Sequence, residues 1–415
     1  MNIFTIIILG ALLFSYLLNR AAGVLNLRTL GDPLPAEFES VYDARDYARM
    51  QEYTRANTRF GFITATFDLA VLLLFWSAGG FNRLDLLVRG WGFSPLISGL
   101  LYIGLLMLGS RLLSLPFAIY ETFVIEERFG FNRTTVRTFV LDLLKGLALS
   151  MALGGPLLAG LLAFFDHAGE WAWLYAWLVT AGYSLLVSFV APSWIMPLFN
   201  KFTPLEEGEL RSAILTYAEK VRFPFKGIFV MDGSKRSSKA NAFFSGFGKN
   251  KRIALFDTLI EKHTTDELVA VLAHEIGHYK KRHILTGMLI SIVHMGIIFF
   301  LLSLFIRLTG LHKAFGMEHI SLYAGLLFFG LLYSPVEIIL GPLMNLLSRR
   351  HEFEADRFAA VTSGLGESLI TSLKKLSRDH LSHLTPHPFL VFLHYSHPPL
   401  LKRIESIRMN MSGAA

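Results

Sequence analysis

The chain has 415 residues, of which 53% are hydrophobic and only 17% are charged, a composition that excludes a typical soluble enzyme and indicates a multi-pass membrane protein. It contains no cysteine, which excludes both disulfides and a thiolate-ligated metal site. The basic residues behind the net charge of +7 lie between apolar runs, so they indicate membrane topology rather than nucleic-acid binding.

Apolar stretches long enough to cross a bilayer, which takes about 20 residues, occur throughout the chain. The seven candidates are residues 2–19, 60–82, 91–120, 146–165, 171–200, 284–306 and 320–348. The first could instead be a cleaved signal peptide, but its n-region carries no positive charge, so we expect a retained span. Seven spans place all the basic segments on one side. The positive-inside rule makes that side cytoplasmic, with the N-terminus outside and the C-terminus inside.

Charged side chains within or beside these spans are costly in lipid and should face the bundle interior or water. They could line a chamber, or they could pair with one another across helices, and we favour structural pairing for most of them. The residues are Asp68, Arg111, Asp142, Lys145 and Glu337.

The segment between the fifth and sixth spans reads as a cytoplasmic insertion with a small β-hairpin. We predict a helix over Glu206–Val221, a strand over Ile228–Met231, and a hairpin of Asn241–Phe247 and Arg252–Phe256 turning through 248–251. Thr264, with Glu267 three residues on, is a capping-box pattern that begins a further helix. The predicted division of the chain is 1–200, 201–283, 284–348 and 349–415.

The run His274-Glu275-Ile276-Gly277-His278 lies late in that helix. Residues four apart share a helix face, so His274 and His278 can aim their imidazoles at one cation. Glu275 is not expected to be a ligand. In an H-E-x-x-H motif this glutamate serves as the general base toward water at a zinc site.

A third ligand is needed, because catalytic zinc sites usually have three from the protein. The metzincin spacing requires Gly at 281 and His at 284, but the chain has Lys281 and Ile284, which excludes that class. His283 is one position out, and we interpret it as a basic residue at a membrane edge.

A better candidate follows the seventh span. Glu352 and Asp356 share a helix face, whereas Glu354 points elsewhere. Glu352 could supply the third ligand, and Asp356 could accept the free N–H of a metal-bound histidine. Alone, such a charged run is more often a solvated helix surface; beside an H-E-x-x-H helix the balance reverses.

Together these motifs resemble the zinc-dependent CaaX prenyl protease family of integral-membrane gluzincins. The resemblance covers nearly the whole chain and includes Asn241-Ala242-Phe243, Lys251-Arg252-Ile253, residues 255–259 and His397-Pro398-Pro399. It implies a mainly α fold, in which a seven-span bundle encloses a water-filled chamber and the zinc site faces into it.

The resemblance also implies a role for each matching residue. It makes His274, His278 and Glu352 the ligands of one Zn²⁺ per chain, and Glu275 the base. It places Asn241, with Ala242 and Phe243, along the substrate backbone. It places His397 and Arg403 near the scissile carbonyl or the C-terminal end of the peptide, although a helix cap or core contact would also explain them.

The family implies prenylated CaaX substrates, but nothing in the chain itself reads a prenyl group. Short loops, no retrieval signal and the ending Met-Ser-Gly-Ala-Ala suit a bacterial inner membrane better than the endoplasmic reticulum. The alternatives are a quality-control protease of the HtpX type, or a catalytically silent scaffold or transporter. The expected partners are a peptide or lipidated peptide and the bilayer, with no nucleic acid and no required oligomer.

Overall fold

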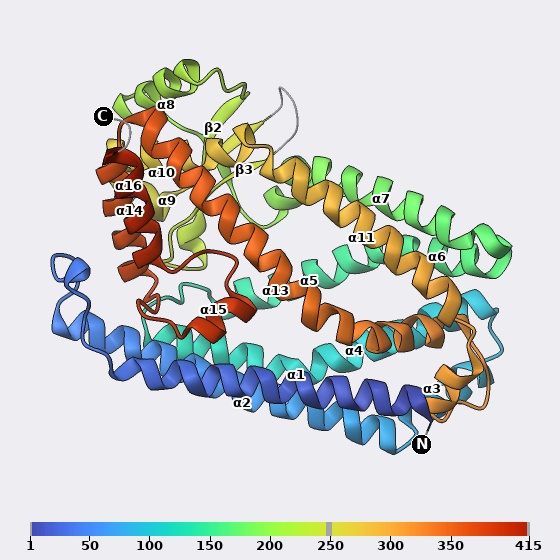
Figure 1. The fold of residues 1–415 in the computed structure, drawn as a ribbon. Coiled ribbons are helices and arrows are strands. Elements are labelled where there is room, and N and C mark those ends of the chain that lie inside the picture. Colours follow the sequence, from blue (N-terminus) through green and yellow to red (C-terminus); the bar gives the residue numbers. More distant parts are fainter. Residues whose placement is uncertain (1, 246–250, 413–415) are drawn as a thin grey trace.

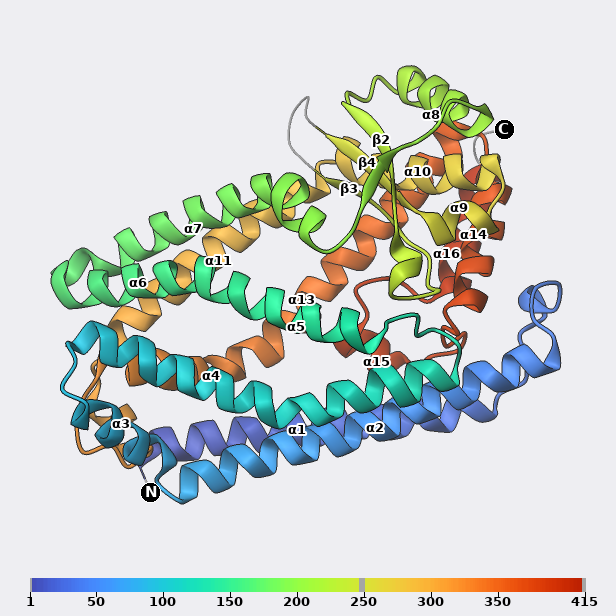
Figure 2. The ribbon, with the colours of Figure 1, turned by 180° about the vertical axis from the view of Figure 1, so that it is seen from behind.

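The computed structural model describes residues 2–245 and 251–412, and it is mainly helical. The membrane part is built from long helices that run side by side, with both chain ends drawn at opposite ends of the molecule (Figures 1 and 2). Its helices are α1 (Ile3–Arg28), α2 (Ala44–Ser77), α3 (Gly80–Gly90), α4 (Pro95–Tyr120), α5 (Val136–Leu149), α6 (Gly155–His167), α7 (Ala172–Val190), α11 (His283–Phe305), α12 (Thr309–Ala314) and α13 (Leu322–Ser363).

The seven predicted spans are confirmed, since the described residues contain seven helical segments long and apolar enough to cross a membrane. A π-helical turn, Ser150–Gly154, joins α5 and α6 into one of them. The helices are longer than the apolar runs: α2 begins at Ala44, and α13 continues to Ser363. The hydropathy pattern marks only the apolar part of a helix, whereas the backbone hydrogen bonds continue into the polar residues beyond it.

At one end of these helices lies a small domain around a four-stranded sheet of order β1-β2-β4-β3 (Figure 2). Its strands are β1 (Phe202–Pro204), β2 (Gly227–Met231), β3 (Ala242–Ser245) and β4 (Arg252–Phe256). The predicted hairpin is confirmed as the antiparallel pair β3–β4, although most of its turn lies outside the described residues. β3 is an edge strand of this sheet.

Six further helices lie outside the spans in the described residues. They are α8 (Glu209–Lys220), α9 (Asp257–Lys262), α10 (Thr265–Lys280), α14 (Gly366–Asp379), α15 (Pro388–His394) and α16 (Leu400–Ser412). Among them α10 packs against α8, α14 and β3, whereas α15 packs against α13 and α1. Ala270, Ala273 and Ile276 of α10 are fully buried. The predicted capping box is present: the Thr264 hydroxyl accepts from the Glu267 backbone N–H, and the Glu267 carboxylate accepts from the Thr264 N–H. The start of α10 is therefore fixed by its own sequence and its packing by the core.

Of the charged residues predicted to need partners, Asp142 ties α5 to this domain, and Lys145 ties α5 to the end of the fifth span. Arg236 donates to both carboxylate oxygens of Asp142 on α5, at 2.7 and 2.9 Å. Lys145 Nζ donates to the Leu198 carbonyl at 2.7 Å. Glu337 Oε1 lies 3.6 Å from His294 Nε2. Asp68 lines a groove between α1 and α2. Asp142 and Lys145 thus have structural contacts of the kind we favoured.

Candidate metal centre

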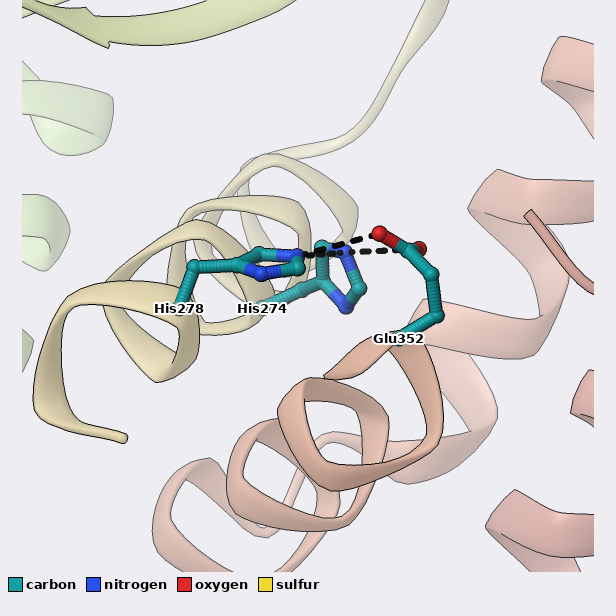
Figure 3. Close-up of side chains that lie close together, drawn as sticks. All are labelled: His274, His278 and Glu352. Atoms are coloured by element: carbon teal, nitrogen blue, oxygen red, sulfur yellow. Dashed lines mark hydrogen bonds and ion pairs between the residues drawn. The ribbon is translucent and has the colours of Figure 1, made fainter. Parts of the chain in front are cut away.

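Two helices bring together three of the predicted ligands. His274 and His278 project from α10, and Glu352 faces them from α13 (Figure 3). The two Nε2 atoms lie 3.2 Å apart. Glu352 Oε1 is 3.2 Å from His278 Nε2, and Oε2 is 3.5 Å from His274 Nε2. His278 and Glu352 are 74 residues apart in the sequence, and the fold brings their side chains into direct contact, as predicted for two ligands of one metal.

These distances fit a tetrahedral metal site. Zinc bonds of about 2.0–2.2 Å to nitrogen and oxygen give ligand-to-ligand edges of about 3.3–3.6 Å. In addition, Glu352 Oε2 is buried and accepts no hydrogen bond from the described residues. A buried acceptor without a donor is costly, and a cation at this point would satisfy it. The donor set of two imidazoles and a carboxylate suits zinc.

The close approach of α10 to α13 depends on Gly277 inside the motif. A Cβ atom added at Gly277 would lie 3.0 Å from Ala355 Cα and 3.1 Å from the Ala355 carbonyl oxygen. Any larger residue would push the two helices apart. Glycine at this position therefore sets the distance from His278 to Glu352.

A buried ion pair orients the first histidine. His274 Nδ1 lies 2.8 Å from Asp356 Oδ1. Arg403 holds the same carboxylate through two hydrogen bonds of 2.7 and 2.8 Å. Because an ionised carboxylate only accepts, Nδ1 of His274 carries the proton and Nε2 presents its lone pair to the site. Burial lowers the pKa of His274, but the neighbouring carboxylates of Asp356 and Glu352 outweigh it and raise the pKa to about 9, so protons compete with a metal for this ring.

A cavity of about 800 Å³ opens in front of the ligands and contains most of the other predicted site residues. Glu275 lines it, and burial raises the pKa of its carboxyl. Asn241 and Ala242 line it too, whereas Phe243 packs edge-on against Phe256.

His397 and Arg403 both line this cavity, but the His397 side chain is exposed and the Arg403 side chain is buried. The His397 side chain is 63% exposed and its Nε2 lies 3.4 Å from Glu352 Oε1. Desolvation within the cavity lowers the pKa of its imidazole. Arg403 is buried, and besides its bonds to Asp356 it places Nη1 3.5 Å from Glu352 Oε2. Arg403 thus contacts the predicted ligand Glu352 and also Asp356, the partner of His274, and the sequence did not indicate these contacts.

His283 begins the candidate sixth span, so it lies at the expected membrane edge, but its side chain is buried against the motif rather than free. The residue is 7% exposed, and its Nδ1 lies 3.1 Å from Nδ1 of His278. Arg282, with φ of +61°, turns the chain between α10 and α11 and brings His283 back to the motif. Non-glycine residues seldom adopt this conformation, so no sequence signal predicted the turn.

Two histidines of the cavity wall were also missed. His380 Nε2 accepts a hydrogen bond from the Ala240 N–H at 3.0 Å, next to Asn241. Both ring nitrogens of His383 are buried and lack a partner among the described residues. Neither residue belongs to a spacing motif, so only the folded chain could place them.

Comparison with known proteins agrees with this geometry. Residues 24–201 match the family model described as CAAX prenyl protease N-terminal, five membrane helices, and residues 204–410 match peptidase family M48. The chain is 36% identical over 401 residues to CAAX prenyl protease 1 of Saccharomyces cerevisiae, covering 90% of this chain and 88% of that one. It is 35% identical over 418 residues to the CAAX prenyl protease 1 homolog of Arabidopsis thaliana, covering 96% of both.

A solved structure shows the same fold. The crystal structure of S. mikatae Ste24p superimposes with a TM-score of 0.93 at 34% identity, covering 98% of this chain and 99% of that one. The M48 match implies zinc as the metal, and the matches do not favour the HtpX-type or scaffold alternatives. The chain therefore belongs to peptidase family M48, as a multi-pass membrane metalloendopeptidase of the CAAX prenyl protease family.

Proposed function

We propose that this enzyme uses one zinc ion, held by His274, His278 and Glu352, to remove the C-terminal tripeptide of prenylated CaaX proteins or related peptides. The observation that carries the proposal is the convergence of the three ligand atoms, within 4.8 Å of one another, beside a cavity lined by Glu275. The same cavity is lined by residues of membrane helix α2, among them Tyr53 and Asn57. These two residues come just before the apolar run at 60–82, so the cavity lies beside the end of the second span.

The protein's own groups supply the proton transfers. Zinc bound here would act as a Lewis acid and lower the pKa of water at the site. The Glu275 carboxylate takes a proton from the attacking water and later delivers it to the leaving amine. Its raised pKa brings this base closer to the working pH, which favours both transfers.

His397 and Arg403 take different roles in the proposal. His397 Nε2, exposed to the cavity beside Glu352, can donate to the oxyanion that develops on the scissile carbonyl. Arg403 is committed to Asp356 and acts as a positioning residue for His274. Asp356 fixes the tautomer of that ligand.

The edge strand β3 offers a way to bind an extended peptide. Asn241 Oδ1 accepts from the Ala242 N–H at 2.8 Å, so its amide Nδ2 remains to donate to a substrate carbonyl. A peptide added along β3 would be read mainly through its backbone, so we expect modest sequence selectivity. The cytoplasmic location of the site, the division into four segments and the bacterial inner membrane stay predictions; the relatives named above come from yeast and a plant.

The test combines metal analysis with peptide cleavage by the purified full-length protein. We expect one zinc per chain and faster cleavage of a farnesylated CaaX peptide than of its unprenylated twin. E275Q should keep the zinc and lose activity by about 10²–10⁴-fold, the usual size of a general-base effect. Equal cleavage of both peptides would refute prenyl specificity. Normal turnover by E275Q would refute the assigned base.

A further inference from the structure

His278 contacts a buried pair that the mechanism above does not use. His283 Nδ1 lies 3.1 Å from Nδ1 of His278, and His283 Nε2 lies 3.1 Å from Glu354 Oε2. Resting on the proposed zinc site, we propose that His283, braced by Glu354, is a positioning residue that sets the tautomer and ring orientation of the ligand His278.

The direction of each hydrogen bond in this chain is fixed by chemistry. Glu354, as a carboxylate, can only accept, so Nε2 of His283 must carry the proton. A neutral imidazole has one donor and one acceptor, so Nδ1 of His283 then accepts. The donor facing it is Nδ1–H of His278. His278 therefore presents the lone pair of Nε2 toward Glu352 and His274, as a metal ligand requires.

The surroundings keep the His283 ring in place. Its ring stacks on that of His351, with centroids 3.9 Å apart and an interplanar angle of 7°. Glu354 also accepts from Arg350 Nε at 3.1 Å, in an exposed pair. The charged groups facing His283 are thus one carboxylate and, behind it, one guanidinium.

In this arrangement each of the two histidine ligands is oriented by a carboxylate. His274 is oriented directly by Asp356, whereas His278 is oriented through His283 by Glu354. Both carboxylates belong to α13 and follow the ligand Glu352, by two and four residues. One helix therefore supplies the third ligand and orients the other two.

The test measures zinc affinity by competition with a chelator, which is a readout independent of activity. H283F keeps an aromatic ring for the stack on His351 but has no acceptor, so we expect a loss of affinity of about 10–100-fold. H283N can place its amide oxygen near the position of Nδ1, so it should recover much of that affinity. With zinc saturating, the KM of H283F should stay near that of the wild type.

Two further variants separate orientation from packing. E354L removes the carboxylate at a partly exposed position and should weaken zinc binding without unfolding the protein. R350Q removes only the other partner of Glu354 and should bind zinc as the wild type does. Wild-type affinity in both H283F and E354L, or equal losses in H283F and H283N, would overturn the inference. Absence of zinc from the wild type would refute the proposed function instead.

Discussion

Two arginines on α16 allow a direct test of what burial does to an ion pair. Arg403 and Arg408 each hold a carboxylate through two hydrogen bonds, Arg403 to Asp356 at 2.7 and 2.8 Å, and Arg408 to Glu37 at 2.6 and 2.8 Å. The Asp356 side chain is fully buried and that of Arg403 is 10% exposed, whereas Arg408 is 47% exposed. The same change, Arg to Met, removes the charge at both sites and retains most of the aliphatic volume.

The expected cost differs because the charge left behind differs. R403M leaves Asp356 buried with His274 as its remaining partner, and breaking one side of a buried pair costs about 3–5 kcal/mol. R408M leaves Glu37 partly solvated and still paired with Lys374, so the cost should be about 0–1 kcal/mol. We therefore expect the two variants to differ by roughly 3 kcal/mol in free energy of unfolding.

The assay is chemical denaturation of the purified protein in detergent micelles, with both variants and the wild type under one condition. Neutralising the orphaned carboxylate with D356N in the R403M background should recover part of the loss, which shows up as a coupling energy between the two sites. Equal stability of R403M and R408M would refute the argument. The argument would also be refuted if the loss of stability in the double variant R403M/D356N equalled the sum of the losses in R403M and D356N.

Three other outcomes follow from the structure. G325A places a Cβ within 1.9 Å of the Ile306 carbonyl oxygen and should cost about 1–3 kcal/mol or more. G330A on the same helix meets nothing within 4 Å and should be neutral or stabilising by up to about 1 kcal/mol, so equal denaturation midpoints for the two would contradict the packing argument. Burial lowers the pKa of His380 and His383 to about 4 from the ordinary 6.5. The unfolded chain then binds more protons, so stability is full above about pH 6.5 and falls as pH drops toward about 4. H383L should reduce the loss of melting temperature between about pH 6.5 and about pH 4. The same loss in H383L and the wild type would contradict this assignment. Removing zinc with a chelator should lower the melting temperature, and added zinc, unlike magnesium, should restore it. A free zinc concentration of about 1,000 times Kd stabilises the folded state by about 4 kcal/mol.

The parts of this molecule that sequence predicts are those set by local rules. The spans follow from apolar runs, the start of α10 from Thr264 and Glu267, and the facing of His274 and His278 from helix geometry. Glu352 could be found because one helix turn relates it to Asp356. His283 could not, because its position depends on a left-handed residue at Arg282 and on a contact with α13. His380 and His383 could not be predicted for a related reason. The cavity wall is assembled from segments that are distant in the sequence, so its residues follow no periodic pattern.

Helix α13, with Pro335 and Pro342 inside it, carries both the seventh span and the ligand Glu352. It runs without interruption from Leu322 to Ser363, so the seventh span and the residues that face α10 share a single backbone. Pro342 and Glu352 are ten residues apart, which is about 15 Å along a helix axis. Any tilt of the span therefore moves Glu352 relative to His278, unless the contact at Gly277 and Ala355 resists it. The small residues at that contact permit close packing, and the buried pair of Asp356 and Arg403 locks it. We conclude that the ligand geometry is held by helix packing at the end of a membrane span, and that a substitution which separates α10 from α13 should weaken metal binding even when all three ligands are intact.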